Sequence, residues 1–192
     1  MTLDALRAGD PRALEALLQD VWAPLVRHLT GVTGSRDTAQ DAAQEAFVRL
    51  WERRERWVSG SLRALVYRIG RNVALDMVRR GRVRERWARQ EARGGPGGAD
   101  HASPSPDRVL EHAEVRWRVE SALGRLPARR REAFELVRFA GLTHQEVAEV
   151  MDLSPQTVAN HLSLALRDLR AELADVVEPR PGHRPDARSR DG

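Results

Sequence analysis

Polar side chains near the C-terminal end of the chain have the chemistry to read the edges of DNA bases. Between residues 154 and 167 they are Ser154, Gln156, Thr157, Asn160, His161, Ser163 and Arg167. The two amides can donate and accept hydrogen bonds together, which suits paired contacts with adenine. The apolar residues that recur among them at helical spacing are Val158, Leu162, Ala165, Leu166 and Leu169. We therefore expect one helix with an apolar face and a polar face.

A second, shorter helix is expected immediately before this one. Thr143 and Glu146 have the T-x-x-E spacing of a capping box at its start. Asp152 lies in the turn, Ser154 is a good N-cap residue, and Pro155 stands at the first helical position, where a missing N–H costs nothing. Two helices in this arrangement predict a helix-turn-helix, whose second helix lies in the DNA major groove. An ordinary helical hairpin with a polar outer face is the alternative.

The composition allows a nucleic-acid partner, although a GC-rich genome can also explain the arginine content, and it excludes several kinds of catalytic site. The chain has 192 residues, 32 arginines and no lysine or cysteine. These absences exclude a P-loop lysine, a lysine Schiff base, disulfides and thiolate zinc sites. Residues 1–90 carry 17 arginines against 11 acidic residues, whereas residues 109–178 carry nine against 12. The basic half suits a nucleic-acid backbone, and we expect the acidic half to bind DNA only when another contact holds it there.

The first 90 residues are expected to form a helical domain. Apolar residues at helical spacing predict helices that begin at Asp10, at Ser35 or Asp37, and near Ser61. Pro24 falls inside the first of these patterns, and we expect it to kink or split that helix.

The rest of the chain divides into a linker, a second domain and a tail. Glycines, serines and prolines over residues 91–105 predict a flexible linker. Residues 106–178 are expected to form the helix-turn-helix domain, winged-helix-like but without strands, including a helix over 128–140 with Gly141 as its C-cap. Residues 179–192 are expected to be disordered. The predicted fold class is thus all-α, with two small domains joined by a flexible linker.

Three stretches, taken in order, resemble the extracytoplasmic-function group of bacterial sigma factors, the two-domain members of the sigma-70 family. The first, DTAQDAAQEAFVRLW (residues 37–51), resembles the helix that binds the polymerase clamp. The second, RALVYRIGRNVALDMVRR (residues 63–80), resembles the helix that reads and opens the −10 promoter element. The third, residues 122–169, resembles the −35-binding domain. The resemblance covers about residues 10–90 and 106–173.

This resemblance implies a transcription initiation factor rather than an enzyme, with no cofactor and no metal. Such a protein binds core RNA polymerase, through the β′ clamp helices and the β flap, and directs it to promoter DNA. A further partner, an anti-sigma factor, is usual in this group. The chain has no apolar run of ~18 residues and no signal peptide, so we expect a cytoplasmic protein without direct membrane insertion.

The resemblance also assigns residues to each task. The candidates for core-polymerase binding are Asp41, Gln44, Glu45, Phe47 and Trp51. The candidates for −10 DNA are Trp57, Ser59, Ser61, Asn72, Asp76, Arg79 and Arg80. The candidates for −35 DNA are Arg130, Arg131, Ser154, Gln156, Thr157, Asn160, His161 and Arg167. Three alternatives stay open: Phe47 packs in the core, Asp76 pairs with a nearby arginine, and the arginines at 129–131 are a solvated run.

Two other classes of protein remain possible from the residues alone. A stand-alone helix-turn-helix regulator would bind an operator as a dimer, with the N-terminal helices as the dimer core. An α-helical enzyme would need a catalytic or metal cluster. The six histidines do not have the spacing of metal ligands, so the enzyme class is disfavoured.

Overall fold

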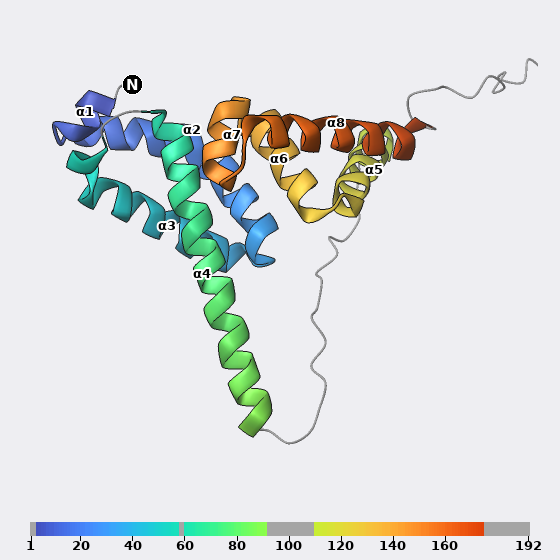
Figure 1. Cartoon of the computed structure of the whole chain (residues 1–192), viewed down its shortest axis with the longest axis horizontal. Coiled ribbons are helices and arrows are strands. Elements are labelled where there is room, and N and C mark those ends of the chain that lie inside the picture. Colours follow the sequence, from blue (N-terminus) through green and yellow to red (C-terminus); the bar gives the residue numbers. More distant parts are fainter. Residues whose placement is uncertain (1–2, 58–59, 92–109, 175–192) are drawn as a thin grey trace, which may run out of the picture.

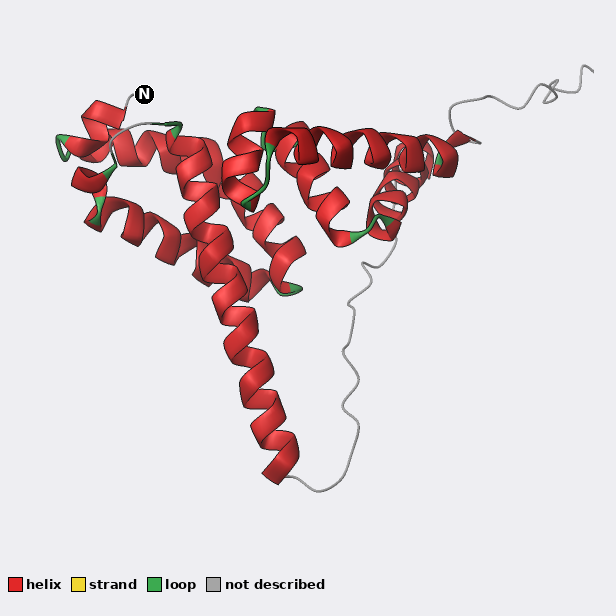
Figure 2. Ribbon diagram, in the orientation of Figure 1, coloured by secondary structure: helices red, strands yellow, loops and turns green. Residues whose placement is uncertain are grey.

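The computed structural model describes residues 3–57, 60–91 and 110–174, and all regular structure in them is helical (Figure 2). The elements are α1 (Leu3–Arg7), α2 (Pro11–Thr33), α3 (Arg36–Glu52), a short 3-10 turn η1 (Arg54–Arg56), α4 (Leu62–Glu91), α5 (Leu110–Arg125), α6 (Ala128–Arg138), α7 (His144–Met151) and α8 (Pro155–Glu172). The all-α class is therefore confirmed. The predictions for Ser59, for the linker beyond Glu91 and for the tail lie outside the described residues.

Local signals in the sequence fix the ends of α2. The Asp10 side chain accepts a hydrogen bond from the Arg12 N–H, with Pro11 in the first turn. Gly34 ends the helix in the left-handed conformation, with φ of 74°. Pro24 lies inside this continuous helix, so of the two expected outcomes, a kink or a split, the split does not occur. The buried apolar face on both sides of the proline holds the two halves in one helix.

Helices α2, α3 and α4 form a bundle in which small residues let the backbones approach closely. On α3 the fully buried positions Ala39, Ala42, Ala43 and Ala46 form one face, with the i, i+3, i+4, i+7 spacing of a helix stripe. On α4 a Cβ added at Gly70 would lie 3.2 Å from Leu29 Cδ1 of α2. The C-terminal half of α4 projects away from the bundle (Figure 1). The bundle therefore leaves a long stretch of α4 exposed.

The helix-turn-helix has the caps that the sequence predicts. The Glu146 N–H donates to Thr143 Oγ1 at 3.2 Å, and the Thr143 N–H donates to Glu146 Oε2 at 2.7 Å. Asp152 adopts the left-handed conformation, with φ of 56°, and is the only non-glycine residue with positive φ in the described part of the chain. Ser154 caps α8 by accepting from the Thr157 N–H. These contacts set the angle between α7 and α8.

The two helical groups pack against each other, which the sequence did not predict. Helix α7 lies against α4, and α6 lies against α2; Figure 1 shows α7 beside the upper part of α4. One buried cluster runs from the α2–α4 bundle into α6 and α7, where it includes Leu136, Val147 and Met151. A smaller cluster joins α5 to α8 through Leu123 and Leu169. No described helix is both long and apolar enough to cross a bilayer.

Candidate nucleic-acid interface

The exposed face of α8 carries a coupled pair of amides. Gln156 Nε2 donates a hydrogen bond to Asn160 Oδ1 at 3.2 Å, and both residues are exposed. This bond uses one donor and one acceptor, which leaves Gln156 Oε1 and the Asn160 amide hydrogens for an outside partner. His161 lies one residue further along and is partly buried. The pair can therefore form paired contacts with a base edge.

Ser154 and Thr157 have a structural role at the start of the same helix. Besides accepting from the Thr157 N–H at 3.1 Å, the Ser154 hydroxyl lies 2.8 Å from the Thr157 hydroxyl. The N-terminal turn of α8 is thus ordered by its own cap. One of the two hydroxyl hydrogens is used between these side chains. The other hydroxyl can still donate to a phosphate, and free lone pairs can accept from a base.

Two of the three predicted arginine candidates near this helix are engaged within the protein. Arg130 of α6 forms an ion pair with Asp168 of α8 at 2.7 Å, and Arg167 contacts the same carboxylate at 3.0 Å. Hydrogen bonds from Arg167 and Arg130 lower the pKa of Asp168. Arg131 is partly buried beside a cavity. Arg130 therefore links α6 to α8 through this ion pair. The sequence had suggested either a DNA contact or a solvated arginine run, and neither includes such a link.

The described −10 candidates divide between the projecting part of α4 and its start. Asn72, Arg79 and Arg80 are exposed on α4. Asp76 pairs with Arg79 at 3.5 Å, as the alternative for this residue expected. At the start of the helix, the Ser61 hydroxyl accepts a bond from the Ala64 N–H.

Trp57, which precedes α4 in the chain, has its side chain held by a hydrogen bond to α3. Its Nε1–H donates to the Leu50 carbonyl oxygen at 3.3 Å, and the ring is partly buried. Its indole therefore offers a base one aromatic surface rather than a free hydrogen-bond donor.

The polymerase-binding candidates on α3 are only partly on the surface. Asp41, Gln44 and Glu45 share an exposed or half-exposed face of α3. Phe47 is 5% exposed and packs against Trp22, with ring centroids 6.2 Å apart, so the core-packing alternative describes Phe47. Trp51 is partly buried, with the Arg54 guanidinium 4.8 Å from its ring centroid. The exposed face of α3 therefore does not include Phe47.

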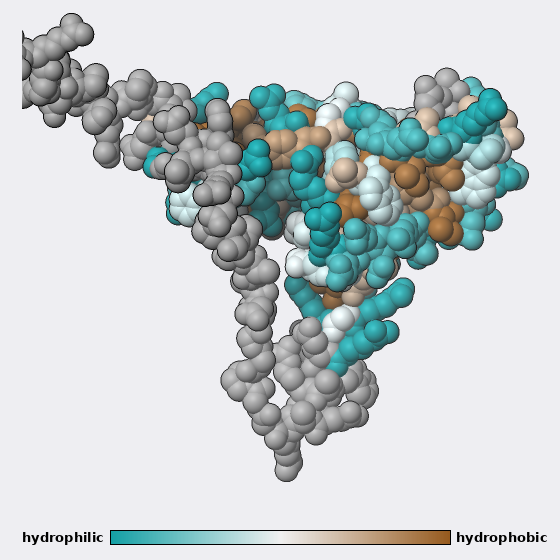
Figure 3. Space-filling view, turned by 180° about the vertical axis from the view of Figure 1, so that it is seen from behind, coloured by the Kyte–Doolittle hydropathy of each residue, from teal (hydrophilic) through white to brown (hydrophobic). Residues whose placement is uncertain are grey.

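An apolar residue that the sequence reasoning missed completes this face. Val48 is 49% exposed, and its spacing of three, four and seven residues from Glu45, Gln44 and Asp41 puts it on the same side of α3. Leu18 of α2 is also exposed. Figure 3 shows hydrophobic surface gathered over α2 and α3 on the face seen from behind. In the sequence, the helical spacing of Val48 from the three polar candidates could have placed it on this face.

A buried ionic cluster joins the two helical groups. Arg71 of α4 contacts Glu132 of α6 through Nε at 2.6 Å and through Nη2 at 3.4 Å. His28 of α2 lies 3.9 Å from the same carboxylate, and neither ring nitrogen has a hydrogen-bond partner. Burial, reinforced by Arg71 and opposed by Glu132, lowers the pKa of His28 to about 4. His28 is thus neutral near pH 7.

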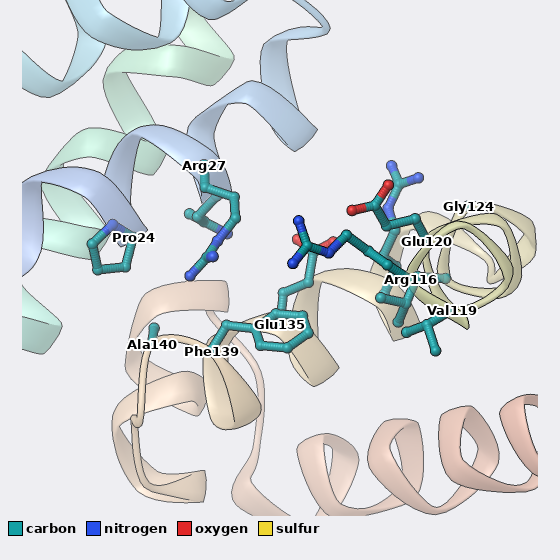
Figure 4. Close-up of a pocket in the computed structure, with 12 residues that line it drawn as sticks. Pro24, Arg27, Arg116, Val119, Glu120, Gly124, Glu135, Phe139 and Ala140 are labelled. Atoms are coloured by element: carbon teal, nitrogen blue, oxygen red, sulfur yellow. The ribbon is translucent and has the colours of Figure 1, made fainter. Parts of the chain in front are cut away.

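A cavity of about 670 Å³ lies between α2, α5 and α6. Figure 4 shows Arg27, Arg116 and Glu135 reaching toward it from these three helices, with Val119 and Phe139 as apolar neighbours. Burial raises the pKa of Glu135, while Arg131 opposes the shift. Within the described ranges, no three His, Asp or Glu residues are grouped so as to hold a metal ion.

The described part of the chain is all-helical, and comparison with known families gives the class of protein. The model for sigma-70 region 2 matches residues 16–84, and the model for sigma-70 region 4 matches residues 116–169. The chain belongs to the extracytoplasmic-function sigma factors of the sigma-70 family, which direct promoter-specific transcription initiation by RNA polymerase and are not enzymes. The stand-alone regulator is therefore not favoured.

Individual relatives support this assignment over most of the chain. The RNA polymerase sigma factor CnrH of Cupriavidus metallidurans is 31% identical, over 86% of this chain and 89% of CnrH. The ECF sigma factor SigE of Mycolicibacterium smegmatis is 27% identical, and this chain spans 65% of its length. The solved structure of CnrH in complex with the cytosolic domain of CnrY has the same fold, with a TM-score of 0.61 and 23% identity over 92% of this chain and 96% of that chain.

Proposed function

We propose that three separate surfaces of this sigma factor divide the work of initiation. The observation that carries the proposal is the order of the two matched regions in one chain, each with an exposed polar face. The domain that ends with α4 binds the polymerase and the −10 element. The helix-turn-helix domain binds the −35 element.

The polymerase surface is the exposed face of α3. Asp41, Gln44 and Glu45 supply carboxylate and amide oxygens, and Val48 adds an apolar side chain that water does not solvate well. Trp51 lies at the edge of this face. We expect the β′ clamp helices to bind here, while Phe47 supports the surface from beneath through its contact with Trp22. The β flap is expected to bind the second domain.

The −10 surface combines an aromatic ring with exposed arginines. Trp57 offers a face on which an unstacked base can stack. Further along α4, Asn72 can contact a base edge, and Arg79 and Arg80 can neutralise backbone phosphates. Ser61 lies at the start of this surface, and Ser59 stays a candidate by its place in the sequence. Asp76 acts through Arg79, which it orients.

The −35 surface is the outward face of α8. The Gln156–Asn160 pair is the candidate base reader, because an amide can pair with adenine through two hydrogen bonds. His161 and Arg167 extend this face along the helix, and Ser154 and Thr157 hold its first turn near the phosphates. Arg130 and Arg131 contribute positive potential from α6.

Two partner assignments follow from relatives. The sigma factor RpoE of Bartonella quintana, 23% identical over 84% of this chain and 96% of that one, with a TM-score of 0.60, was solved in complex with the anti-sigma factor NepR. We infer that this chain also has an anti-sigma partner. Because bacterial polymerase and the chromosome lie in the cytoplasm, we place the protein there, without direct membrane insertion.

Matched variants on two surfaces test this division. Val48→Asp should weaken binding to core polymerase, and Asn160→Ala should leave that binding intact while reducing promoter-specific transcripts. Glu15→Gln, an exposed change on α2 outside the proposed surfaces, is the matched control. If Val48→Asp binds core polymerase like the control, the α3 surface is wrongly assigned. If Asn160→Ala initiates normally, α8 does not read the −35 element through this amide.

A further inference from the structure

The cavity between α2, α5 and α6 has the size of a small-molecule site and has no part in the proposed function. Its volume of about 670 Å³ falls within the range of about 300–1,000 Å³ that is usual for ligand pockets. Pro24, Val119 and Phe139 contribute apolar wall. Because protein interiors are close-packed and leave few voids larger than a water molecule, a cavity of this size can admit a ligand with an apolar body.

Guanidinium groups from all three helices line this cavity. Arg27 comes from α2, Arg116 from α5 and Arg131 from α6, and Figure 4 shows Arg27 and Arg116 on opposite sides. Arg27 contacts Phe139, with 5.3 Å between its Cζ atom and the ring centroid. Among the described residues, none of the three guanidinium groups has an ion pair or a side-chain hydrogen bond. Their N–H groups are therefore available to an anion.

Two carboxylates also line the cavity. Glu120 is exposed on α5, and Glu135 is partly buried on α6. Burial raises the pKa of Glu135, and Arg27 and Arg131 lie near enough to oppose that rise. With three guanidinium groups against two carboxylates, the lining keeps an excess of positive charge. The cavity therefore favours an anionic ligand over a cationic one.

His28 lines the same cavity with unused hydrogen-bonding groups. Its side chain is only 4% exposed, and neither ring nitrogen has a partner. It also lines a second cavity of about 310 Å³, which shares Arg131 and Glu135 with the first. Buried polar groups without partners are rare, because the hydrogen bonds lost with water cost free energy. A bound ligand can supply the missing partner.

We propose that this cavity binds a small amphipathic anion, an acid with an aromatic or an acyl body. The apolar body packs against Val119 and Phe139. The acidic group accepts hydrogen bonds from Arg27 and Arg131, and the neutral imidazole of His28 donates a further one. This site does not rest on the proposed function, and binding can be measured on the free chain without DNA or polymerase.

A fluorescent acid and matched competitors test the site on the full-length chain. The probe 8-anilinonaphthalene-1-sulfonate combines an aromatic body with one negative charge, and it should bind saturably with one molecule per chain. The acid 2-naphthoate should displace it at least about tenfold more tightly than the neutral 2-naphthamide, because only the acid accepts charge-assisted hydrogen bonds. Stronger displacement by 2-naphthoate than by decanoate would assign an aromatic body, and the reverse an acyl body. Failure of both acids to displace the probe would overturn the proposal.

Loss of either arginine should weaken binding of the acid selectively. Arg27→Gln and Arg131→Gln should each lower the affinity for 2-naphthoate at least about fivefold and leave that for 2-naphthamide unchanged. His28→Leu should act in the same direction, because it removes the buried donor. Arg12→Gln, which changes an exposed arginine of α2 outside the cavity, is the matched control. Equal affinities in the control and in both arginine variants would overturn the proposal.

Glu135 should have the opposite effect, which separates ligand binding from a general loosening of the fold. Glu135→Gln removes a negative charge from the lining and keeps the side-chain shape, so the affinity for 2-naphthoate should rise at least about twofold. Glu149→Gln, an exposed change on α7, should leave it unchanged. An affinity that fails to rise in Glu135→Gln would contradict the proposed site.

A bulky side chain in the wall should block the cavity without changing its charge. Val119→Trp should abolish saturable binding of the fluorescent probe, because the indole fills space that the apolar body needs. Urea unfolding of the variant establishes that it is folded. Undiminished probe binding in folded Val119→Trp would place the probe elsewhere and overturn the proposal. If Val119→Trp does not fold, the exposed Arg27→Gln variant decides.

Discussion

Acidification should destabilise the protein through His28. This residue is 4% exposed, and its pKa falls from 6.5 to about 4 because the protonated ring is costly to bury. The unfolded chain therefore binds a proton at a pH where the folded chain does not. The free energy of unfolding falls as the pH drops from about 6.5 toward 4 and levels off below 4. The full shift corresponds to about 3 kcal/mol, of which about 2 kcal/mol is lost between pH 7 and pH 5.

Urea unfolding, followed by tryptophan fluorescence at half-unit steps from pH 7 to pH 5, measures this loss. The His28→Leu variant should lose most of the pH dependence, because the titrating group is gone. His144→Gln, which removes an exposed histidine, should keep it. Staying above pH 5 limits the contribution of carboxylates such as Glu146 and Asp168, whose pKa values are lowered. A wild-type slope equal to that of His28→Leu would refute the reasoning.

Three further predictions concern single residues. Gln156→Ala or Asn160→Ala should weaken discrimination at one base pair of the −35 element by about 1–2 kcal/mol, measured by competition between promoter duplexes in the presence of polymerase; uniform weakening on all sequences would contradict base reading. Val48→Asp should weaken binding to core polymerase by at least about 1 kcal/mol, measured by titration of labelled protein, and an unchanged affinity would remove Val48 from that surface. Asp152→Ala should lower the free energy of unfolding by about 1 kcal/mol, because alanine tolerates the left-handed conformation poorly, whereas Asp152→Gly should not lower it; equal stability of the two variants in urea would contradict this account.

The features predicted best from the sequence depend on neighbouring residues. The capping box of Thr143 and Glu146, the Ser154 cap and the Asp152 turn each involve side chains at most a few residues from the backbone they contact. Short-range rules are sufficient for such contacts, and the structure confirms them. Pro24 shows their limit, because the buried apolar face of α2 outweighs the preference of one residue to break the helix.

The features that the sequence did not predict depend on packing between distant segments. Arg71 and Glu132 are 61 positions apart, and no local pattern indicates that they pair. Arg130 likewise looked like part of a charged run until the structure placed Asp168 beside it. Phe47 could have faced either way, since its ring lies at the border of the apolar stripe of α3. In each case the partner comes from another helix, so only the fold decides the role.

Reconstitution with core RNA polymerase tests the central claim most directly. The purified chain would be mixed with bacterial core polymerase and fragments of its own genome, and the transcript ends would be mapped. The account predicts co-elution with core polymerase and transcripts that start at defined sites, each preceded by shared −10 and −35 sequences, only when the chain is added. Tight promoter binding by the chain alone, with no association with core polymerase and no dependent transcripts, would contradict it.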